Sequence, residues 1–292
     1  MLNYEGTRVV MCGCHSGIGY EVTRLLLDNG AQVTGLDIRP TTLAVEEFIQ
    51  LDLGDESTIE AALGRIVGPL DAVIVTSAIP HKTNPGINCQ IVNFVGVRRL
   101  VEGLVPKIKR GGAIAITSSG GGAGYTQHMP ELLDLVSNHR SFEEGRAWSE
   151  ERLDLVSNHR SFEEGRAWSQ ERLDLVGEGY FFSKECINVY VMWRAHSLLR
   201  DHAIRLNCIA PGAVDTEAMN RWAIETGDPI KATIGRNPKP VEQAWPLLFL
   251  ASELASVING QVVWTEQGLM NAALTGQLDM TAGYPETAGD GG

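Results

Sequence analysis

The segment GCHSGIG places Gly13, Gly17 and Gly19 between two patterned stretches near the start of the chain. The stretch before it, TRVVMCG, is a short apolar run that predicts a buried strand, and SGIGYEVTRLLLDNG after it has the apolar spacing of a helix that ends at Gly30. The run AQVTGLD predicts a second strand. Strand, glycine-rich turn, helix and strand form a βαβ unit, which restricts the chain to folds built on a parallel sheet.

The same alternation continues along the rest of the chain. Helical spacing predicts helices near 56–67, 88–109, 178–199 and 241–254, and apolar runs predict strands at 70–78, 111–119, 203–210 and 260–265. Strands that alternate with helices indicate an α/β protein with a doubly wound parallel sheet and helices on both faces. The length of 292 residues suits a single domain over 1–292.

The charge balance excludes several classes of partner. The formal net charge is −12 and no basic run occurs, which argues against a nucleic-acid backbone or an anionic membrane surface as the main partner. The N-terminal stretch lacks the pattern of a signal peptide and no apolar run is long enough to cross a bilayer, so we expect a cytoplasmic protein. The five scattered cysteines predict reduced thiols. Cys12, Cys14 and His15 offer three adjacent ligands without a distant fourth, so we predict no metal site.

A glycine-rich turn that opens a helix is suited to a pyrophosphate. Glycine lets the main chain turn tightly and lets a phosphate approach the N–H groups at the helix N-terminus, where the helix dipole favours negative charge. The predicted contacts in this turn are Gly13, Ser16, Gly17, Ile18 and Gly19. The turn predicts a dinucleotide site, because a strand precedes it, a helix follows it and an acidic residue ends the next strand.

That acidic residue is Asp37, in VTGLDIRP. A carboxylate in this place can accept both hydroxyls of an adenosine ribose and would repel a 2′-phosphate, so it favours NAD over NADP. Arg39, two positions later, weakens that preference, and the alternative is an Asp that only faces solvent. Ile38 would lie beside the adenosine, and Asp52 and Leu53, which follow the next short strand, would reach the adenine edge.

A second motif lies far downstream, where YFFSK contains Tyr180 and Lys184, four positions apart and hence on one face of a helix. Together with the glycine-rich turn and Asp37, this motif resembles the short-chain dehydrogenase/reductase family, and the resemblance covers nearly the whole chain outside a duplicated segment. The resemblance implies a Rossmann-type fold and a catalytic set made of Asn93, Ser119, Tyr180 and Lys184.

Each member of this set has a role that the family implies. Ser119, the second serine of AITSS, would hydrogen-bond the substrate oxygen, with Ser118 as the alternative, and Asn93 in IVNFVG would hold a relay water. Tyr180 would exchange the proton of the hydroxyl group while Lys184 holds the ribose. An ammonium beside the phenol, with the cationic nicotinamide nearby, would lower the pKa of Tyr180.

Two further segments match family positions at the cofactor. CIAPGAVDT would close over the nicotinamide, and TSAI at 76–79 stands where the family has NNAG, so Thr76 or Ser77 must supply its structural hydrogen bonds. The usual Thr that opens the glycine-rich motif is Cys12, and EQG at 266–268 replaces DGG. The cofactor contacts that follow from these matches are Ser77, Ala78, Tyr180, Lys184, Pro211, Gly212, Val214 and Thr216.

An insertion separates Ser119 from Tyr180. Within it, LDLVSNHRSFEEGRAWS occurs at 133–149 and again, unchanged, at 153–169. Two copies are too few for a solenoid, so the sequence predicts a duplicated insertion over about 125–177 that is helical, amphipathic and partly exposed. A long segment in this place resembles the branch that contains bacterial 3α-hydroxysteroid dehydrogenase/carbonyl reductase and the coniferyl-alcohol dehydrogenases.

The insertion is expected to roof the substrate cleft or to alter a contact between subunits, and an inert surface excursion is the alternative. The roof would use the aromatic residues Phe142, Trp148, Phe162 or Trp168. In the wider family the helix with the Tyr–Lys pair packs against its twin, so the resemblance implies a homodimer or homotetramer whose interface the insertion would change.

The resemblance implies an NAD-dependent oxidoreductase that interconverts a secondary, cyclic or aryl alcohol and its carbonyl. Phe181, Trp193, Met219 and Trp222 would suit a bulky apolar substrate if two of them face the cleft, although most such residues belong to cores. Two alternatives stay open. One is an NAD-binding regulator without turnover, and the other is a sugar-nucleotide epimerase or dehydratase, which would need a larger C-terminal domain.

Overall fold

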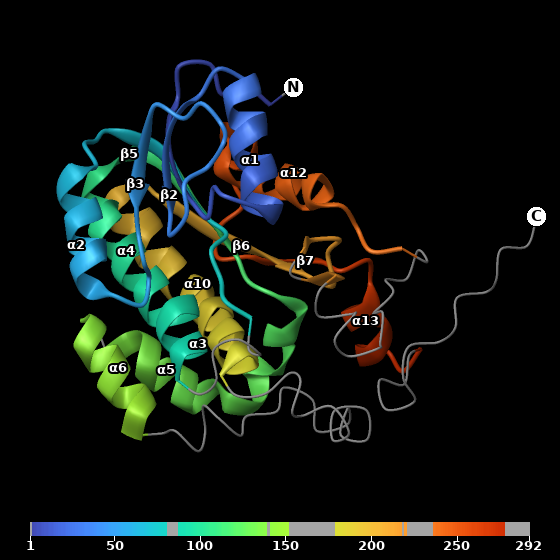
Figure 1. Ribbon diagram of the computed structural model, residues 1–292. Coiled ribbons are helices and arrows are strands. Elements are labelled where there is room, and N and C mark those ends of the chain that lie inside the picture. Colours follow the sequence, from blue (N-terminus) through green and yellow to red (C-terminus); the bar gives the residue numbers. More distant parts are fainter. Residues whose placement is uncertain are drawn as a thin grey trace, which may run out of the picture.

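Seven parallel strands form the centre of the molecule (Figure 1). The computed structural model describes residues 2–80, 87–138, 141–151, 179–217, 219–220 and 236–277. The strands are β1 (Arg8–Cys12), β2 (Gln32–Asp37), β3 (Glu47–Gln50), β4 (Leu70–Val75), β5 (Ile108–Thr117), β6 (Arg205–Pro211) and β7 (Val262–Thr265). Their order in the sheet is β3-β2-β1-β4-β5-β6-β7, and all neighbouring pairs are parallel. The carboxyl ends of the strands therefore lie along one edge, where doubly wound sheets bind their ligands.

Helices cover both faces of this sheet, as predicted. The helices α1 (Gly17–Asp28) and α12 (Pro240–Ala251) pack on one face, and α2 (Glu56–Arg65), α4 (Val97–Leu104) and α10 (Tyr180–His202) pack on the other (Figure 1). Successive side chains of a strand point to opposite faces, so each strand contributes to two cores. Val73 and Val75 lie in the core with α4 and α10, whereas Ile74 between them lies in the core with α1 and α12.

Local signals fix where these helices begin and end. The carboxylate of Asp55 accepts a hydrogen bond from the Ser57 N–H at 2.9 Å and caps the start of α2. Helix α10 begins after Gly179 and ends at Ala203, with φ values of 92° and 55°. Both residues lie in the left-handed region, which a right-handed helix cannot continue through.

The predicted helix at 88–109 is interrupted and ends earlier than expected. The structure divides it into α3 (Asn88–Gln90), a π-helical turn η2 (Ile91–Gly96), α4 and a 3-10 turn η3 (Val105–Lys107). Pro106 lies in η3 and cannot donate the main-chain hydrogen bond that a longer helix needs. The chain therefore leaves the helix here and β5 begins at Ile108 rather than at 111.

The first copy of the duplicated segment is helical and amphipathic, as predicted. The 3-10 helix η4 (Gly120–His128) leads into α5 (Met129–Asn138), and α6 (Phe142–Glu151) follows. Leu135, Val136, Phe142 and Trp148 of this copy are buried in the core shared with α10 and η2. The second copy, at 153–169, lies outside the described residues.

The remaining described helices are the 3-10 turn η5 (Glu253–Ala255) and α13 (Leu269–Leu274), which follow α12 and β7 respectively. Within the ranges that the structure describes, no helix has both the length and the apolar character needed to cross a membrane. All five cysteines are free and buried, as the sequence predicted for reduced thiols.

Candidate active site

The glycine-rich turn packs so closely that side chains have no room. Gly13 has a φ of 96°, and a Cβ on it would lie 2.5 Å from Oγ1 of Thr76 and 2.7 Å from the Ser77 nitrogen. A Cβ on Gly19 would overlap the carbonyl oxygen of Gly13. Glycine is therefore required here both by backbone conformation and by close approach of the main chain.

The turn also leaves polar groups open for an anion. Ser16 is exposed and precedes the first residue of α1, and its side chain makes no capping hydrogen bond. A Cβ built on Gly17 would lie 3.5 Å from Cγ2 of Thr216, so the turn and the segment after β6 meet at this point. A helix N-terminus next to an unused hydroxyl and a bare main chain fits the pyrophosphate of a dinucleotide.

The substitutions in the TSAI segment are compensated by hydrogen bonds from both residues that the sequence named. The Thr76 hydroxyl donates to the carbonyl oxygen of Cys12 at 3.2 Å, and the Ser77 hydroxyl lies 3.3 Å from the Cys12 sulfur. Cys12 thus takes a place in the contacts between β1 and the end of β4. Ala78, the next residue, is exposed at the same strand end.

Asp37 faces the glycine-rich turn instead of standing free in solvent. Its carboxylate accepts hydrogen bonds from the main-chain N–H groups of His15 at 3.0 Å and Arg39 at 3.1 Å. Ile38 beside it is exposed. The carboxylate lies at the end of β2, next to the turn, where the adenosine ribose of a dinucleotide would lie.

The two predicted adenine contacts differ in what they can offer. The Asp52 carboxylate accepts the Gly54 N–H at 2.8 Å and stabilises its own loop. Leu53 is buried in the core, and the Leu53 carbonyl group packs so close to Gly96 that no Cβ would fit there. The Leu53 side chain is therefore unavailable to a nucleotide, because it is buried in the hydrophobic core.

Ser119 and Tyr180 come together at the carboxyl end of β5. The Ser119 hydroxyl lies close enough to the Tyr180 side chain to lower the pKa of the phenol, and it accepts the Gly121 N–H at 3.1 Å. Ser118, the alternative, is buried and its hydroxyl bonds to groups of α10. Of the two serines, Ser119 is the one that faces the tyrosine.

The pKa of Tyr180 is raised in the protein alone, whereas the sequence-based expectation of a lowered pKa includes a bound nicotinamide. Burial raises the pKa of Tyr180, and the hydrogen bond from Ser119 lowers it by less. The Lys184 ammonium lies 5.6 Å from the centroid of the tyrosine ring and donates to the Thr117 carbonyl oxygen at 3.3 Å. In the protein alone, removal of the phenol from water is the largest cause of the shift.

Lys184 itself is buried, on the same face of α10 as Tyr180. Burial lowers the pKa of Lys184 to about 8, and the nearby thiols of Cys89 and Cys208 partly offset this. A buried ammonium without a carboxylate among these neighbours is suited to hold hydroxyl groups of a bound molecule.

Asn93 sits in the π-helical turn η2 and links three elements. Its Oδ1 accepts the Ile79 N–H at 2.8 Å, and its Nδ2 donates to the Ile79 carbonyl at 3.1 Å and to the Ser183 hydroxyl at 3.3 Å. The buried amide therefore fixes the segment after β4 against the start of α10. Its part in holding a relay water stays a prediction.

The segment that is predicted to close over the nicotinamide, CIAPGAVDT at 208–216, leaves the sheet where β6 ends. Pro211 is the last residue of β6, and a Cβ on Gly212 would lie 3.1 Å from Cβ of Glu266. Val214 is buried, and the Thr216 hydroxyl accepts the Met219 N–H at 3.2 Å. The segment thus runs from the sheet edge to the glycine-rich turn.

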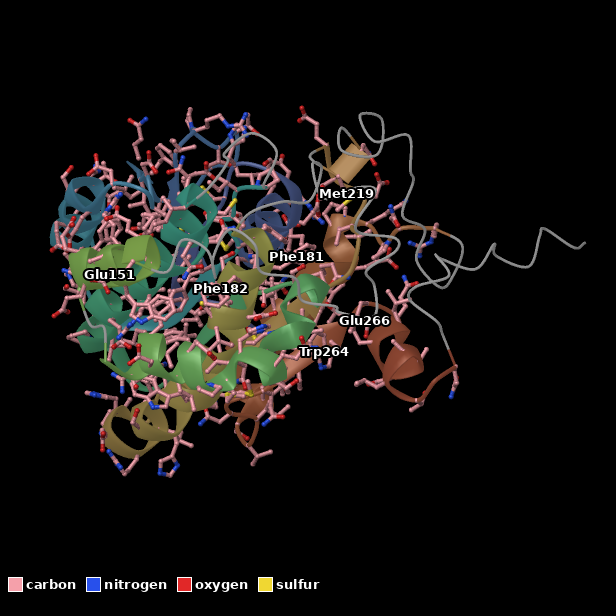
Figure 2. The ribbon with its side chains drawn as sticks, turned by 90° about the horizontal axis from the view of Figure 1, so that it is seen from below. Glu151, Phe181, Phe182, Met219, Trp264 and Glu266 are labelled. Atoms are coloured by element: carbon pink, nitrogen blue, oxygen red, sulfur yellow. The ribbon has the colours of Figure 1, made fainter. Side chains whose placement is uncertain are left out.

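Sequence analysis did not assign a role to Glu266. It is buried after β7, and its carboxylate accepts the Met270 N–H at 3.1 Å, which joins the strand end to α13 (Figure 2). The EQG triplet that replaces DGG was the signal in the sequence. Glu266 backs the glycine of the closing segment, where an extra methylene lengthens the reach of the carboxylate.

The aromatic residues named as pocket candidates divide into different environments. Phe181 lies edge-on to Tyr180 with ring centroids 5.9 Å apart, and it packs against Gly121 (Figure 2). Trp193 is exposed on α10, away from this pair in sequence by three helical turns. Trp222 lies outside the described residues, as do Phe162 and Trp168.

The prediction that Phe142 and Trp148 roof a cleft is wrong. Both are buried, and Trp148 stacks on Phe182 with centroids 6.1 Å apart and an interplanar angle of 7°. Its ring nitrogen donates to the Asp134 carboxylate at 2.6 Å. The apolar face of the first copy is buried in the core, so these two rings are not available to a substrate.

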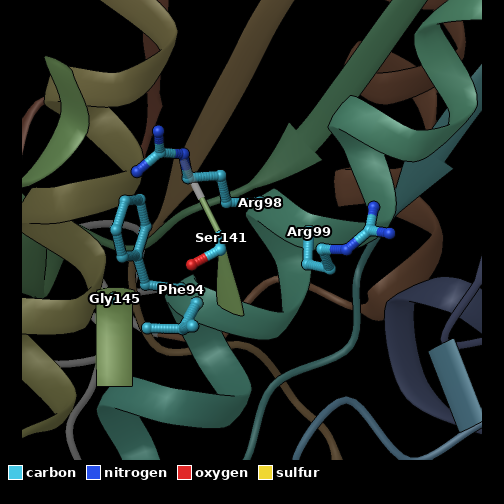
Figure 3. A pocket seen from close by; sticks show the side chains of 6 residues that line it. Phe94, Arg98, Arg99, Ser141 and Gly145 are labelled. Atoms are coloured by element: carbon cyan, nitrogen blue, oxygen red, sulfur yellow. The ribbon is translucent and has the colours of Figure 1, made fainter. Parts of the chain in front are cut away.

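A small hollow lies between the π-helical turn and the start of α6 (Figure 3). Its lining residues are Phe94, Val95, Arg98, Arg99, Ser141 and Gly145. None of them is a predicted site residue, and the Arg99 guanidinium pairs with Glu56 and Glu60. This hollow is therefore a gap in the packing of the insertion, distinct from the edge where Ser119 and Tyr180 meet.

Comparisons with known proteins agree with this geometry. A family model described as short chain dehydrogenase matches residues 7–130, and one described as Enoyl-(Acyl carrier protein) reductase matches residues 176–270. The chain is 28% identical over 266 residues to coniferyl-alcohol dehydrogenase of Pseudomonas sp. (strain HR199 / DSM 7063), covering 90% of this chain and 96% of that protein.

A second relative and a solved structure point the same way. Over 235 residues the chain is 42% identical to the oxidoreductase YmfI of Bacillus subtilis (strain 168), covering 76% of each. The structure of 3-alpha-hydroxysteroid dehydrogenase from Pseudomonas sp. B-0831 complexed with NADH has a TM-score of 0.70 at 22% identity, covering 93% of this chain and 100% of that one. With the sheet order, the two family models and this identity in agreement, the chain belongs to the short-chain dehydrogenase/reductase family of oxidoreductases, whose dehydrogenases use a nicotinamide cofactor.

Proposed function

We propose that this protein is an NAD-dependent alcohol dehydrogenase/carbonyl reductase acting on a secondary, cyclic or aryl alcohol. The observation that carries the proposal is the proximity of the Ser119 hydroxyl to the Tyr180 side chain, with Lys184 one helical turn further along α10. This pair lies at the carboxyl edge of the sheet, on which the glycine-rich turn and Asp37 also lie.

The residues at this edge would hold the cofactor as follows. Ser16 and the main chain of Gly17, Ile18 and Gly19 would bind the pyrophosphate, and Asp37 would accept the adenosine ribose hydroxyls. Lys184 would hold the second ribose, and the segment from Pro211 to Thr216 would cover the nicotinamide. When bound, the cofactor supplies the acceptor or donor of hydride at the carbon of the alcohol or carbonyl.

The chain's own side chains would handle the oxygen and its proton. The hydroxyls of Ser119 and Tyr180 would bind the carbinol oxygen, because the two side chains lie next to each other at the end of β5. Tyr180 takes the proton of the alcohol in oxidation and returns it in reduction. The raised pKa of Tyr180 in the protein alone keeps the phenol protonated, so cationic groups brought close on binding would be needed to favour the phenolate.

The substrate class rests on two supports. One relative is named for coniferyl alcohol, an aryl alcohol, and a solved structure of the same fold is named for a hydroxysteroid. In this chain Phe181 places an aromatic ring edge-on to Tyr180. An apolar ring beside the proton donor favours a flat or cyclic substrate over a sugar.

The test is a turnover assay with purified protein, NAD and a panel of cyclic and aryl alcohols. Growth of the reduced-nicotinamide absorbance on members of this panel, with little on sugars, is the expected result. Tight NAD binding without turnover on any alcohol or carbonyl would contradict the proposal and favour a cofactor-sensing regulator.

Asp37→Asn is expected to reverse the cofactor preference. The wild-type carboxylate would repel a 2′-phosphate, so the substitution should raise the ratio of kcat/KM for NADP over NAD by about tenfold or more. Initial rates with both cofactors measure this ratio, and Asp52→Asn serves as the matched acidic control. A wild-type protein that already prefers NADP would contradict the role given to Asp37.

Deletion of residues 133–152 is expected to leave the enzyme intact. The shortened chain reads ELLDLVSNHRSFEEGRAWSQE across the junction, which differs from residues 131–151 only in one Gln for Glu. The buried side chains of α5 and α6 are thereby restored. Turnover should therefore change by less than about twofold, and the unfolding temperature by less than about 4 °C. Loss of activity, or a change of oligomeric mass in light scattering, would show that the second copy has a function of its own.

We also infer that the protein is a homodimer or homotetramer in which the insertion shapes the interface. The helices α5 and α6 pack against α10 and η2 respectively. A twin subunit that approached α10 from this side would meet the insertion first. Light scattering of the intact protein checks the mass, and a monomer would contradict this inference.

A further inference from the structure

A buried amide ties the active-site serine segment to the catalytic helix. Asn188 lies one helical turn after Lys184 in α10 and is fully buried. Its Oδ1 accepts a hydrogen bond from the Ser118 hydroxyl at 2.6 Å, and its Nδ2 donates to the Gly122 carbonyl oxygen at 2.9 Å. One side chain thus satisfies a group on each side of Ser119.

The two partners bracket the turn that carries the Ser119 hydroxyl. Ser118 directly precedes Ser119, and its N–H is held by the Ile209 carbonyl of β6 at 2.7 Å. Gly122 closes the turn by donating its N–H to the Ser119 carbonyl oxygen at 3.0 Å. A shift at either end of this five-residue stretch would therefore move the Ser119 hydroxyl.

The main chain at Gly122 packs directly against α10, with no room for a side chain between them. A Cβ on Gly122 would lie 2.7 Å from Nδ2 of Asn188 and 2.9 Å from the carbonyl oxygen of Lys184. The Ser118 hydroxyl also lies 3.2 Å from that carbonyl oxygen. The start of η4 is thus seated directly on the turn of α10 that carries Lys184.

We propose that Asn188 is a positioning residue that holds Ser119 within hydrogen-bond reach of Tyr180. Its two hydrogen bonds act on Ser119 through the main chain of residues 118–122 and do not touch the substrate. The catalytic consequence rests on the proposed function, because Ser119 and Tyr180 are given their roles there. Small displacements of a positioned group lower rates steeply, which is why a second layer of hydrogen bonds matters at such a site.

The chain offers a matched control in Asn207. It is equally buried and makes the same pattern of two bonds, donating to the Ile258 carbonyl at 2.9 Å and accepting the Gln261 N–H at 3.0 Å. These partners precede β7, at the edge of the sheet opposite the carboxyl ends. Loss of this amide removes the same chemistry from a place that has no contact with Ser119.

The experiment compares Asn188→Ala with Asn207→Ala by three measurements. These are the unfolding temperature, the pKa of Tyr180 from the ring-carbon NMR signal of labelled tyrosine, and the kinetics with NAD and an alcohol. Both variants should lose stability by similar amounts. Only Asn188→Ala should raise the pKa of Tyr180 and lower kcat by about 100-fold with the KM for NAD unchanged.

The outcomes separate this inference from the proposed function. An unchanged Tyr180 pKa in Asn188→Ala, or an equal loss of kcat in Asn207→Ala, would overturn the positioning role. If wild type turns over no alcohol, the proposed function fails, while the Tyr180 titration still decides the role of Asn188. Should Asn188→Ala not fold, Ser118→Ala removes one of the two ties alone and must raise the same pKa for the inference to stand.

Discussion

Tyr180→Phe is expected to lower alcohol turnover by about 10²- to 10⁴-fold while NAD binding changes by less than about twofold. The substitution removes only the hydroxyl that lies next to Ser119 and that is proposed to exchange the proton. The ring, its edge-on contact with Phe181 and the nearby Lys184 ammonium stay in place. Steady-state kinetics on the best alcohol of the panel, with NAD titration by fluorescence, measures both quantities.

Tyr190→Phe is the matched control for this prediction. Tyr190 lies in the same helix, is fully buried and donates its hydroxyl to the Glu102 carboxylate at 2.8 Å. Its loss should lower stability but leave kcat nearly unchanged, because Glu102 and Arg194 lie on the side of α10 that faces α4. Turnover that survives in Tyr180→Phe would remove the tyrosine from the mechanism.

Trp148→Ala is expected to destabilise the protein by about 3–5 kcal/mol. The ring is buried, stacks on Phe182 and donates to Asp134, so the substitution creates a cavity and leaves a half-buried carboxylate with one partner fewer. Urea unfolding measures the free energy of unfolding, and Trp193→Ala, on the exposed side of α10, should lose less than about 1 kcal/mol.

A small loss of stability in Trp148→Ala would point to the second copy of the duplicated segment. The segment 153–169 repeats this copy without a difference, and it includes the counterpart residue Trp168. Stability that does not depend on Trp148 would mean that the α10 surface accepts either copy. The double variant Trp148→Ala, Trp168→Ala would then show the full loss.

The parts of the fold that depend on local pattern could be predicted from the sequence. Apolar runs predict the strands and three glycines predict the turn. The four-residue spacing of Tyr and Lys predicts their helix. The break in the helix at 88–109 could not be predicted, because it depends on tertiary contacts. Asn93 and Gly96 fit an ordinary helix pattern, and only the structure shows that they contact Ile79 and Leu53.

The site was predictable as a set of residue types and less so as an arrangement. Ser119 could be preferred over Ser118 only by resemblance, and the structure separates them through the contacts of their hydroxyls. Burial, which the sequence does not show, raises the pKa of Tyr180 in the protein alone, so the lowered pKa beside a bound nicotinamide stays a prediction. The burial of Trp148 was missed for the same reason, since an amphipathic helix does not reveal which surface it will cover.

The π-helical turn Ile91–Gly96 makes this stretch sensitive to length rather than to composition. One residue of a helix corresponds to about 100° of rotation, so the widened turn sets the angle between Asn93 within it and the apolar face of α4 after it. Removing a single residue would restore a regular helix, and either Asn93 would lose Ile79 or Leu100 would leave the core. A one-codon deletion there would therefore uncouple the sheet edge from the helix layer.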